Sequence, residues 1–158
     1  MSLKKLSKKR NLIHQFEKNY DGRWEYVSPG FEDKNTILDF VESNFQKNWV
    51  YEVEHALMGD VSKCFIATEE GKLIGFACYD SSSKGFFGPI GGLEERRKEN
   101  IGQALLIRTL NAMKEYGYGY AIIGWVSDAE QFYRKTVGAE FIKGGNPENS
   151  IYSNLVFM

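Results

Sequence analysis

The stretch Gly88–Leu93 (GPIGGL), followed by residues 94–99 (EERRKE) and 100–106 (NIGQALL), decides how this chain is interpreted. It predicts an apolar strand that loses its side chains towards its end, a short charged loop, and a glycine at the start of a helix. A helix N-terminus carries unpaired backbone N–H groups and a partial positive charge, and small residues let an anion approach them closely. The stretch therefore predicts a phosphate-binding site.

The segments on either side predict a β-sheet flanked by helices. Two apolar runs joined by residues 69–72 predict a β-hairpin, and the strand over 85–92 is expected to continue it in antiparallel order. An amphipathic helix over 100–116 and an apolar strand over 120–126 complete a βαβ unit. The full set comprises strands at 24–27, 64–68, 73–79, 85–92, 120–126, 139–143 and 151–157, and helices at 32–47, 51–58, 100–116 and 129–137. The expected class is α/β, with a central mixed sheet of about seven strands flanked by helices.

Length and charge narrow the type of protein. The 158 residues suit one domain, 1–158, with residues 1–22 as a basic N-terminal extension or helix. The first ten residues hold five of the 20 Lys and Arg and no acid, so the remainder carries 15 basic residues against 21 acidic ones. An acidic body argues against a nucleic-acid partner. No apolar run suits a membrane span or a signal peptide, so the expected location is the cytoplasm, with no membrane partner.

The two cysteines, Cys64 and Cys78, lie within apolar runs and lack the spacing of a metal knuckle. We expect buried, reduced thiols in preference to a redox or nucleophilic role, and no metal site.

The phosphate-loop region resembles the GCN5-related N-acetyltransferase (GNAT) family. The loop signature of that family, Arg or Gln, two residues, Gly, one residue, then Gly or Ala, falls on Arg97, Asn100 and Gly102. Residues 132–141 (FYRKTVGAEF) resemble the helix and Gly-aromatic turn that follow about thirty residues later. The resemblance covers residues 61–142 and implies the GNAT-like acyl-CoA N-acyltransferase fold.

The resemblance implies acetyl-CoA as co-substrate. Its pyrophosphate is expected at the start of the helix, and its pantetheine arm along the exposed edge of the strand that ends at Gly92. Trp125 and Val126 would line the opposite wall. The cofactor-binding residues that the resemblance implies are Gly92, Leu93, Arg97, Lys98, Asn100, Ile101, Gly102, Gln103 and Ala104.

Three positions depart from the loop signature. Asn100 replaces a glycine that often has positive φ, and asparagine is among the few residues that tolerate that region. Lys98 also replaces a usual glycine, and Glu99 puts a negative charge near the phosphates. These departures affect the predicted affinity for the cofactor and not the predicted fold.

For the chemistry, an alkylamine with a pKa of about 10 must lose a proton before it attacks the thioester. Four carboxylates, Asp80, Glu94, Glu95 and Asp128, are either candidate bases or solvated loop charges. Tyr133 stands where the family often has the acid that protonates the leaving sulfur; an ordinary core tyrosine is the other reading. The backbone N–H of Gly92 or Leu93 would meet the developing oxyanion. A catalytic histidine is not expected.

The function that follows is an acetyl-CoA-dependent N-acetyltransferase that transfers acetyl directly to a primary amine in a ternary complex. The acceptor is a small-molecule amine or a protein lysine or N-terminus, and a homodimer is possible because a mixed sheet exposes an edge. A non-catalytic acyl-CoA-binding module is the alternative. A nucleotide-binding or nucleic-acid-modifying protein is the third hypothesis.

Overall fold

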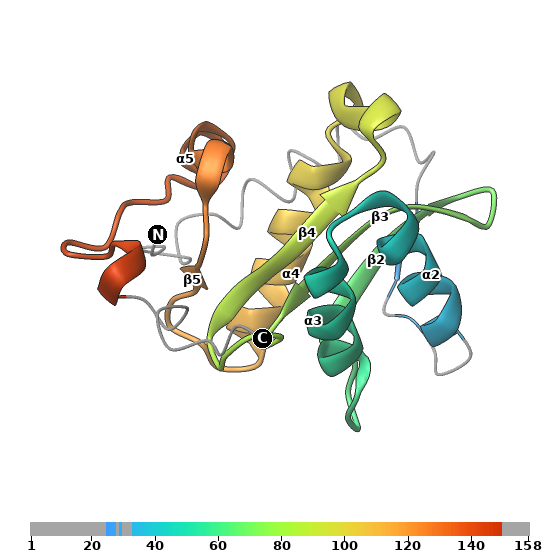
Figure 1. The fold of residues 1–158 in the computed structure, drawn as a ribbon, viewed down its shortest axis with the longest axis horizontal. Helices are drawn as coiled ribbons and strands as arrows, with labels where there is room; N and C mark the ends of the chain where they lie inside the picture. The colour runs from blue at the N-terminus through green and yellow to red at the C-terminus, as the bar shows by residue number, and fades with distance from the viewer. Residues whose placement is uncertain (1–24, 28, 30–32, 150–158) are drawn as a thin grey trace.

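A five-stranded mixed sheet forms the centre of the computed structural model, which describes residues 25–27, 29 and 33–149 (Figure 1). The strands are β1 (Glu25–Val27), β2 (Cys64–Glu69), β3 (Lys72–Tyr79), β4 (Phe86–Gly92) and β5 (Ile122–Ile123), in that spatial order. Neighbours from β1 to β4 are antiparallel, and β4 and β5 are parallel. The predicted mixed sheet, hairpin and βαβ unit are confirmed. The predicted strand at 151–157 and the N-terminal helix lie outside the described residues.

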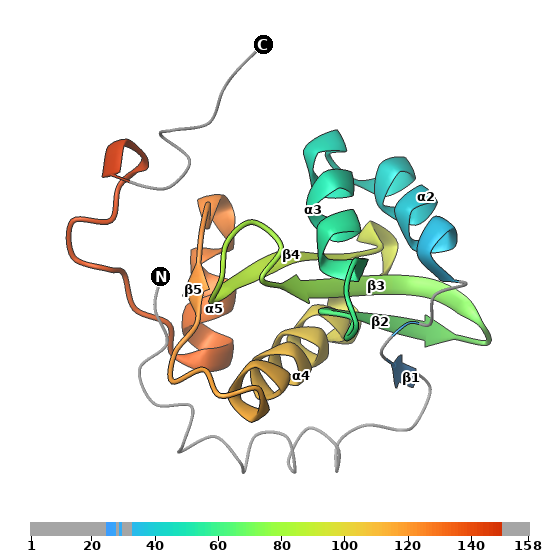
Figure 2. The same cartoon turned by 90° about the horizontal axis from the view of Figure 1, so that it is seen from below.

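Helices cover both faces of the sheet (Figure 2). One face carries α2 (Lys34–Asn44) and α3 (Lys47–Leu57), whose apolar side chains pack with Phe76 and Cys78. The other carries α4 (Ile101–Glu115) and α5 (Glu130–Val137), which share an apolar cluster with Phe87. Short 3-10 helices form η3 (Glu94–Glu99), η4 (Ser127–Ala129) and η5 (Pro147–Asn149). No helix in the described part of the chain is long and apolar enough to cross a membrane.

Gly91 allows an aromatic cluster to pack directly on β4. A Cβ built at Gly91 would lie 2.6 Å from ring atoms of Phe45 and 2.9 Å from Phe76. Phe45 also stacks on Trp49, with ring centroids 5.5 Å apart. Glycine at this position therefore lets the α2–α3 connection lie against the strand.

The boundary between the first two helices differs from the prediction. The apolar period continues through Phe45, which led to a helix over 32–47, but α2 ends at Asn44 and α3 begins at Lys47 rather than at residue 51. Phe45 has an extended backbone, φ −138° and ψ −171°, and its ring fills the space over Gly91. Tertiary packing thus overrides the helical pattern.

The strands predicted after α4 are wrong in extent. Only Ile122 and Ile123 of the run 120–126 pair with β4, at Phe86 and Phe87. Next to these pairs, Gly88 and Trp125 have positive φ values of 121° and 49°, which a regular strand does not have. The strand predicted over 139–143 is reduced to a single bridge residue at Glu140 before a turn, and Phe141 is exposed.

Cys64 and Cys78 lie opposite each other in the β2–β3 pair and are fully buried, free thiols. Burial raises the pKa of Cys78 well above its usual range, helped by its hydrogen bond with Cys64 and by the charges of Cys64 and Glu52. The prediction of buried, reduced thiols is confirmed.

Candidate active site

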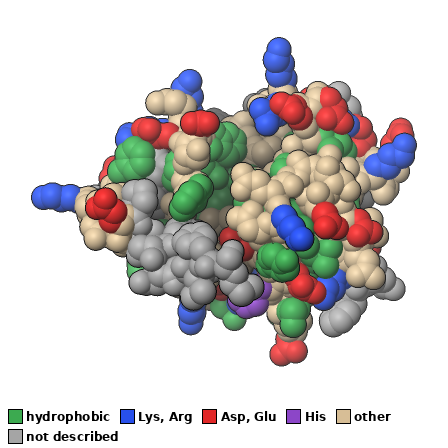
Figure 3. Space-filling view, in the orientation of Figure 1, with side chains coloured by type: hydrophobic (Ala, Val, Ile, Leu, Met, Phe, Trp, Pro, Cys, Tyr) green, Lys and Arg blue, Asp and Glu red, His purple; other side chains and the backbone are tan. Residues whose placement is uncertain are grey.

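The strands β4 and β5 part after two residue pairs. Phe86 pairs with Ile122 and Phe87 with Ile123, and the described part of the chain has no further pairing on that edge of β4. The separation coincides with Gly88, whose φ of +121° is outside the range of ordinary side chains, and with an irregular register against β3. On the face drawn in Figure 3, hydrophobic side chains gather between α5 and β4. The outer edge of β4 beyond Gly88 is therefore unpaired in the described structure.

The hydrogen-bond pattern of β4 shows which amides face this edge. Leu93 N–H donates to the carbonyl of Ile74 over 3.0 Å, and the next pair along is Gly75 with Gly92. Because successive residues of an antiparallel strand point to alternate neighbours, the Gly92 amide faces away from β3. Of the two amides expected at the oxyanion, that of Leu93 is thus already used and that of Gly92 is available.

The phosphate loop ends in the predicted left-handed residue. Asn100 has φ 62° and ψ 17°, so it takes the conformation that a glycine would supply. Helix α4 starts at Ile101, and Ala104 N–H already donates to Asn100 O over 3.1 Å. The amides of Ile101, Gly102 and Gln103 precede this bond and have no intrahelical acceptor. These three amides are the free donors at the predicted anion site, whereas Ala104 has a small, buried side chain and an amide that is already bonded.

Some of the charged side chains of η3 form ion pairs within the protein. Arg96 donates to Glu99 through Nε (2.5 Å) and Nη2 (2.7 Å), and to Glu69 at the end of β2 (2.8 Å). The negative charge of Glu99 is therefore held by Arg96 rather than presented to a phosphate. Arg97 is three-quarters exposed, with Glu94 3.6 Å away, and Lys98 is exposed. Arg97 and Lys98 are the loop cations that can reach an anion.

We expect Asn100→Gly to retain or slightly tighten CoA binding. Glycine populates positive φ readily, so the helix start keeps its shape while a small backbone strain is removed. Titration calorimetry with CoA checks this. A large loss of affinity would mean that the asparagine side chain itself contacts the cofactor.

Tyr133 lies on α5 against the last paired residue of β4. Its ring meets Phe87 edge-on, with centroids 6.2 Å apart, and Phe132 at 5.1 Å. Burial raises the pKa of Tyr133 to about 12, and the structure gives the hydroxyl no hydrogen-bond partner among the described residues. The hydroxyl therefore stays protonated, on a ring that packs against the last residue of β4 to pair with β5.

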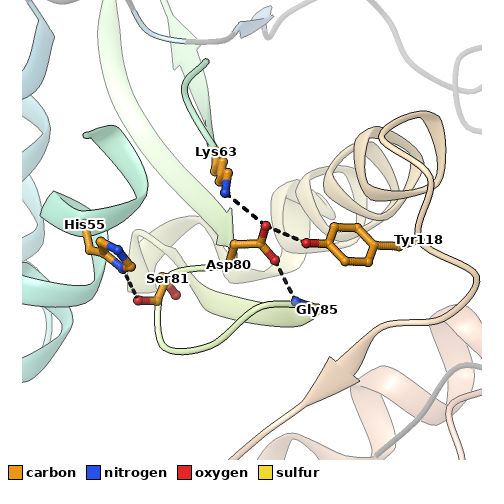
Figure 4. Close-up of polar contacts among 6 residues, drawn as sticks. All are labelled: His55, Lys63, Asp80, Ser81, Gly85 and Tyr118. Atoms are coloured by element: carbon orange, nitrogen blue, oxygen red, sulfur yellow. Dashed lines mark hydrogen bonds and ion pairs between the residues drawn. The ribbon is translucent and has the colours of Figure 1, made fainter. Parts of the chain in front are cut away.

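The carboxylate Asp80 closes the β3–β4 loop (Figure 4). It accepts hydrogen bonds from Lys63 Nζ (3.1 Å), the Tyr118 hydroxyl (2.7 Å) and the Gly85 amide (2.7 Å). Burial alone would raise the pKa of Asp80, but these three bonds and the charge of Lys63 lower it overall. A buried carboxylate with a lowered pKa and three donors is a poor base, so its role is structural.

The other predicted carboxylates and the expected wall residue Trp125 lie at the surface. Glu94, Glu95 and Asp128 are exposed, as solvated loop charges are. Trp125 is 74% exposed and Val126 packs at the edge of the α4–α5 cluster. The structure thus brings together β4, the start of α4 and Tyr133, but none of the four predicted carboxylates.

Two residues of α3 were not among the site residues that the sequence predicts: His55, because no catalytic histidine is expected, and Glu52, which the sequence does not single out. His55 Nδ1 lies 2.6 Å from the carbonyl of Ser81, which only accepts, so Nδ1 carries the proton and donates. Glu52, one turn earlier, is half-buried, and burial raises its pKa. The available signal was an acid at the border of the apolar face formed by Trp49, Val53 and Ala56.

Comparison with known proteins gives a consistent result. A family model described as the Acetyltransferase (GNAT) family matches residues 20–139. No sequence among the curated proteins matches the chain. Solved structures share the fold at low sequence identity.

Three of these structures are similar over most of their length. A ribosomal-protein-alanine N-acetyltransferase from Brucella melitensis biovar Abortus 2308 has a TM-score of 0.57 and 17% identity over 74% of this chain and 92% of its own. An aminoglycoside acetyltransferase from an uncultured soil metagenomic sample has a TM-score of 0.57 and 19% identity, over 77% of this chain and 93% of its own. A GNAT family acetyltransferase from Brucella melitensis in complex with acetyl-CoA has a TM-score of 0.50 and 19% identity, over 69% of this chain and 80% of its own.

Proposed function

The chain belongs to the GNAT family of acetyltransferases, and on that basis we propose that it transfers the acetyl group of acetyl-CoA directly to a primary amine. The observation that carries the proposal is the unpaired outer edge of β4 beside the start of α4. An extended arm with amide groups can pair with a strand edge, and a pyrophosphate suits free helix amides. The acetyl-CoA complex of the similar Brucella melitensis protein supports the same choice of cofactor.

In this arrangement each part of acetyl-CoA has a place. The pyrophosphate lies at the amides of Ile101, Gly102 and Gln103, with Arg97 and Lys98 nearby. The pantetheine arm follows β4 back towards Gly88, and the Gly92 amide is a donor on that edge. In this arrangement Gly92 pairs with the arm and is too far from the thioester to meet the oxyanion, contrary to the expectation from the sequence. The thioester then lies where β4 and β5 part, next to the hydroxyl of Tyr133.

Tyr133 is proposed to stabilise the departing thiolate by donating a hydrogen bond. A thiol such as that of cysteine has a pKa of about 8.5, well below the value of about 12 to which burial raises that of Tyr133. Complete proton transfer to the sulfur is therefore uphill, whereas hydrogen-bond donation is not. Solvent supplies the final proton.

We expect CoA and acetyl-CoA to raise the melting temperature. A ligand that binds only the folded state stabilises it by about 2.7 kcal/mol at a hundredfold excess over its Kd. For a protein of this size that corresponds to a shift of roughly 5–10 °C. Differential scanning fluorimetry with CoA, and with ATP for comparison, measures it. No shift at millimolar CoA would contradict the cofactor assignment, and a shift with ATP alone would favour a nucleotide-binding protein.

Substitutions at Gly102 locate the phosphates. A Cβ at this position would lie 3.6 Å from the Phe132 ring, which is an ordinary contact, so Gly102→Ala should retain the CoA-induced rise in melting temperature. Gly102→Val places a branched side chain at the helix start, where it blocks the approach of a phosphate, and should reduce the shift. An equal shift in both variants would place the phosphates elsewhere.

The acceptor is proposed to be cationic, because the chain beyond its first ten residues carries more acids than bases. The similar proteins include one named for a ribosomal protein alanine and one for aminoglycosides, so both protein and small-molecule amines belong in a screen. Release of CoA with any amine distinguishes transfer from the alternative of a non-catalytic acyl-CoA-binding module.

A further inference from the structure

The gap between β4 and β5 can be reached by an acceptor from one face of the sheet. Helices α4 and α5 cover the face on which the phosphates and Tyr133 lie. Helix α3 lies on the opposite face, as the edge-on view of the sheet shows (Figure 2). An amine that attacks the thioester without displacing the cofactor therefore approaches from the side of α3.

Contacts along α3 fix its position over β4. At its beginning, Trp49 lies 6.2 Å from Phe76, which pairs with Gly91. Near its end, His55 donates to the Ser81 carbonyl, and the Ser81 hydroxyl donates to the carbonyl of Gly88. Helix α3 therefore runs opposite in direction to β4, from the Gly91 end to the Gly88 end.

Glu52 lies between these two contacts along α3. Its charge acts on Cys78, whose pKa it helps to raise, so the two groups are within electrostatic reach. Ala77 pairs with Ile90 and Tyr79 with Phe87, which puts Cys78 opposite the irregularity at Gly88–Pro89. Of the two acids of α3, Glu52 is thus the one whose charge reaches the part of β3 opposite Gly88–Pro89.

The length of the pantetheine arm also places the thioester near Gly88. From Gly92 back to Gly88, four residues of strand span about 13 Å, comparable to an extended pantetheine arm. An arm whose phosphates lie at the start of α4 therefore brings its thioester close to Gly88. Glu52 belongs to α3, the helix on the side of the sheet from which the amine arrives.

The surroundings leave Glu52 without a counter-charge. Its neighbour Glu54 pairs with Lys34 over 2.9 Å, whereas Glu52 has no ion pair among the described residues. The sequence of β4, FFGPIGG, contains no ionisable side chain. The other ionisable groups near the end of α3 are His55, the buried thiols of Cys64 and Cys78, and Asp80. The Asp80 carboxylate accepts hydrogen bonds from Lys63 and Tyr118.

Resting on the proposed function, we propose that Glu52 binds the ammonium group of the acceptor and accepts its proton. The carboxylate takes one proton from R–NH3⁺ to give R–NH2 and a neutral acid. The amine nitrogen then forms the C–N bond with the acetyl carbonyl as the C–S bond breaks, and the electron pair leaves on the CoA thiolate. The nitrogen that has attacked gives its second proton to water, which leaves the neutral amide. Glu52 returns its proton to water.

Burial supports this role. A raised pKa narrows the difference between the carboxyl group and an ammonium group, which favours proton transfer. An unpaired, half-buried carboxylate also gains more from a cationic acceptor than a solvated one does.

The test compares Glu52→Gln with Glu54→Gln, which makes the same change on the neighbouring, ion-paired acid, and with His55→Asn. Acetyl-CoA is the donor, and the acceptors are the primary alkylamines that the wild type uses and an O-alkylhydroxylamine, which is already uncharged at pH 7. We expect Glu52→Gln to lower kcat/KM for alkylamines by about 10²-fold and by much less for the hydroxylamine. The CoA-induced thermal shift should be unchanged in all three variants, and Glu54→Gln should retain wild-type turnover.

The outcomes separate the two proposals. An equal loss with both kinds of amine, a wild-type rate in Glu52→Gln, or a loss confined to His55→Asn would overturn the role of Glu52 while leaving the acetyltransferase intact. A wild type that neither binds CoA nor acetylates any amine would overturn the proposed function, and the role of Glu52 with it.

Discussion

Tyr133→Phe is expected to lower the turnover number by about 10²-fold while leaving CoA affinity unchanged. The variant keeps the ring that packs on Phe87 and Phe132 and removes only the hydroxyl. Removing one preorganised donor to a developing negative charge lowers rates by about 10²- to 10³-fold. Steady-state rates at saturating acceptor, with chemistry shown to limit turnover, measure the effect.

Varying the leaving group serves as the control for Tyr133. Acyl donors with more acidic thiols need less help to depart, so the loss should shrink along such a series. If the tyrosine is purely structural, Tyr133→Phe should leave turnover unchanged at every donor. Its hydroxyl has no hydrogen-bond partner among the described residues, so the substitution should also leave the free energy of unfolding nearly unchanged. Normal turnover in Tyr133→Phe would remove its role in departure of the thiolate.

Asp80→Asn is expected to lower the free energy of unfolding by about 3 kcal/mol, or roughly 6–12 °C in melting temperature. The carboxylate accepts three hydrogen bonds in a nearly closed site, with 4% of its side chain exposed. An amide cannot accept all three or balance the charge of Lys63. Urea unfolding at pH 7 measures the change, and Asp128→Asn, on an exposed turn, should have little effect.

The effect of Asp80 depends on pH in a defined direction. The pKa of Asp80 is lowered in the folded state, so its stabilising effect is present above the unfolded value of about 3.9 and is lost as the pH falls through the folded value. The difference between wild type and Asp80→Asn should therefore shrink in acid. If Asp80→Asn instead lost turnover at full stability, the carboxylate would be acting as a base.

The elements that sequence predicts well are those whose own pattern carries the information. Helix α4 and the β2–β3 hairpin have a clear period and a clear turn, and both are confirmed. The positive φ of Asn100 follows from the steric tolerance of asparagine at a glycine position. Local chemistry is sufficient in each case.

The elements that failed depend on partners distant in sequence. Residues 120–126 form an apolar run, yet only Ile122 and Ile123 pair, because the course of β4 decides where the ladder stops. In the sequence, Asp80 is indistinguishable from a solvated loop acid, because its partners Lys63 and Tyr118 come from two other segments. Glu52 was missed because its significance lies in which strand α3 covers, and no periodicity encodes that.

The two buried, free cysteines simplify an assay that detects thiols. Both thiols of the chain are buried in the native state, and burial raises the pKa of Cys78. A chromogenic disulfide reagent reacts with exposed thiolates, so in native protein it should report only the CoA released. When the protein unfolds, the same reagent should titrate two thiols per chain. One reagent can therefore follow product formation continuously and reveal any variant whose lost activity is due to unfolding.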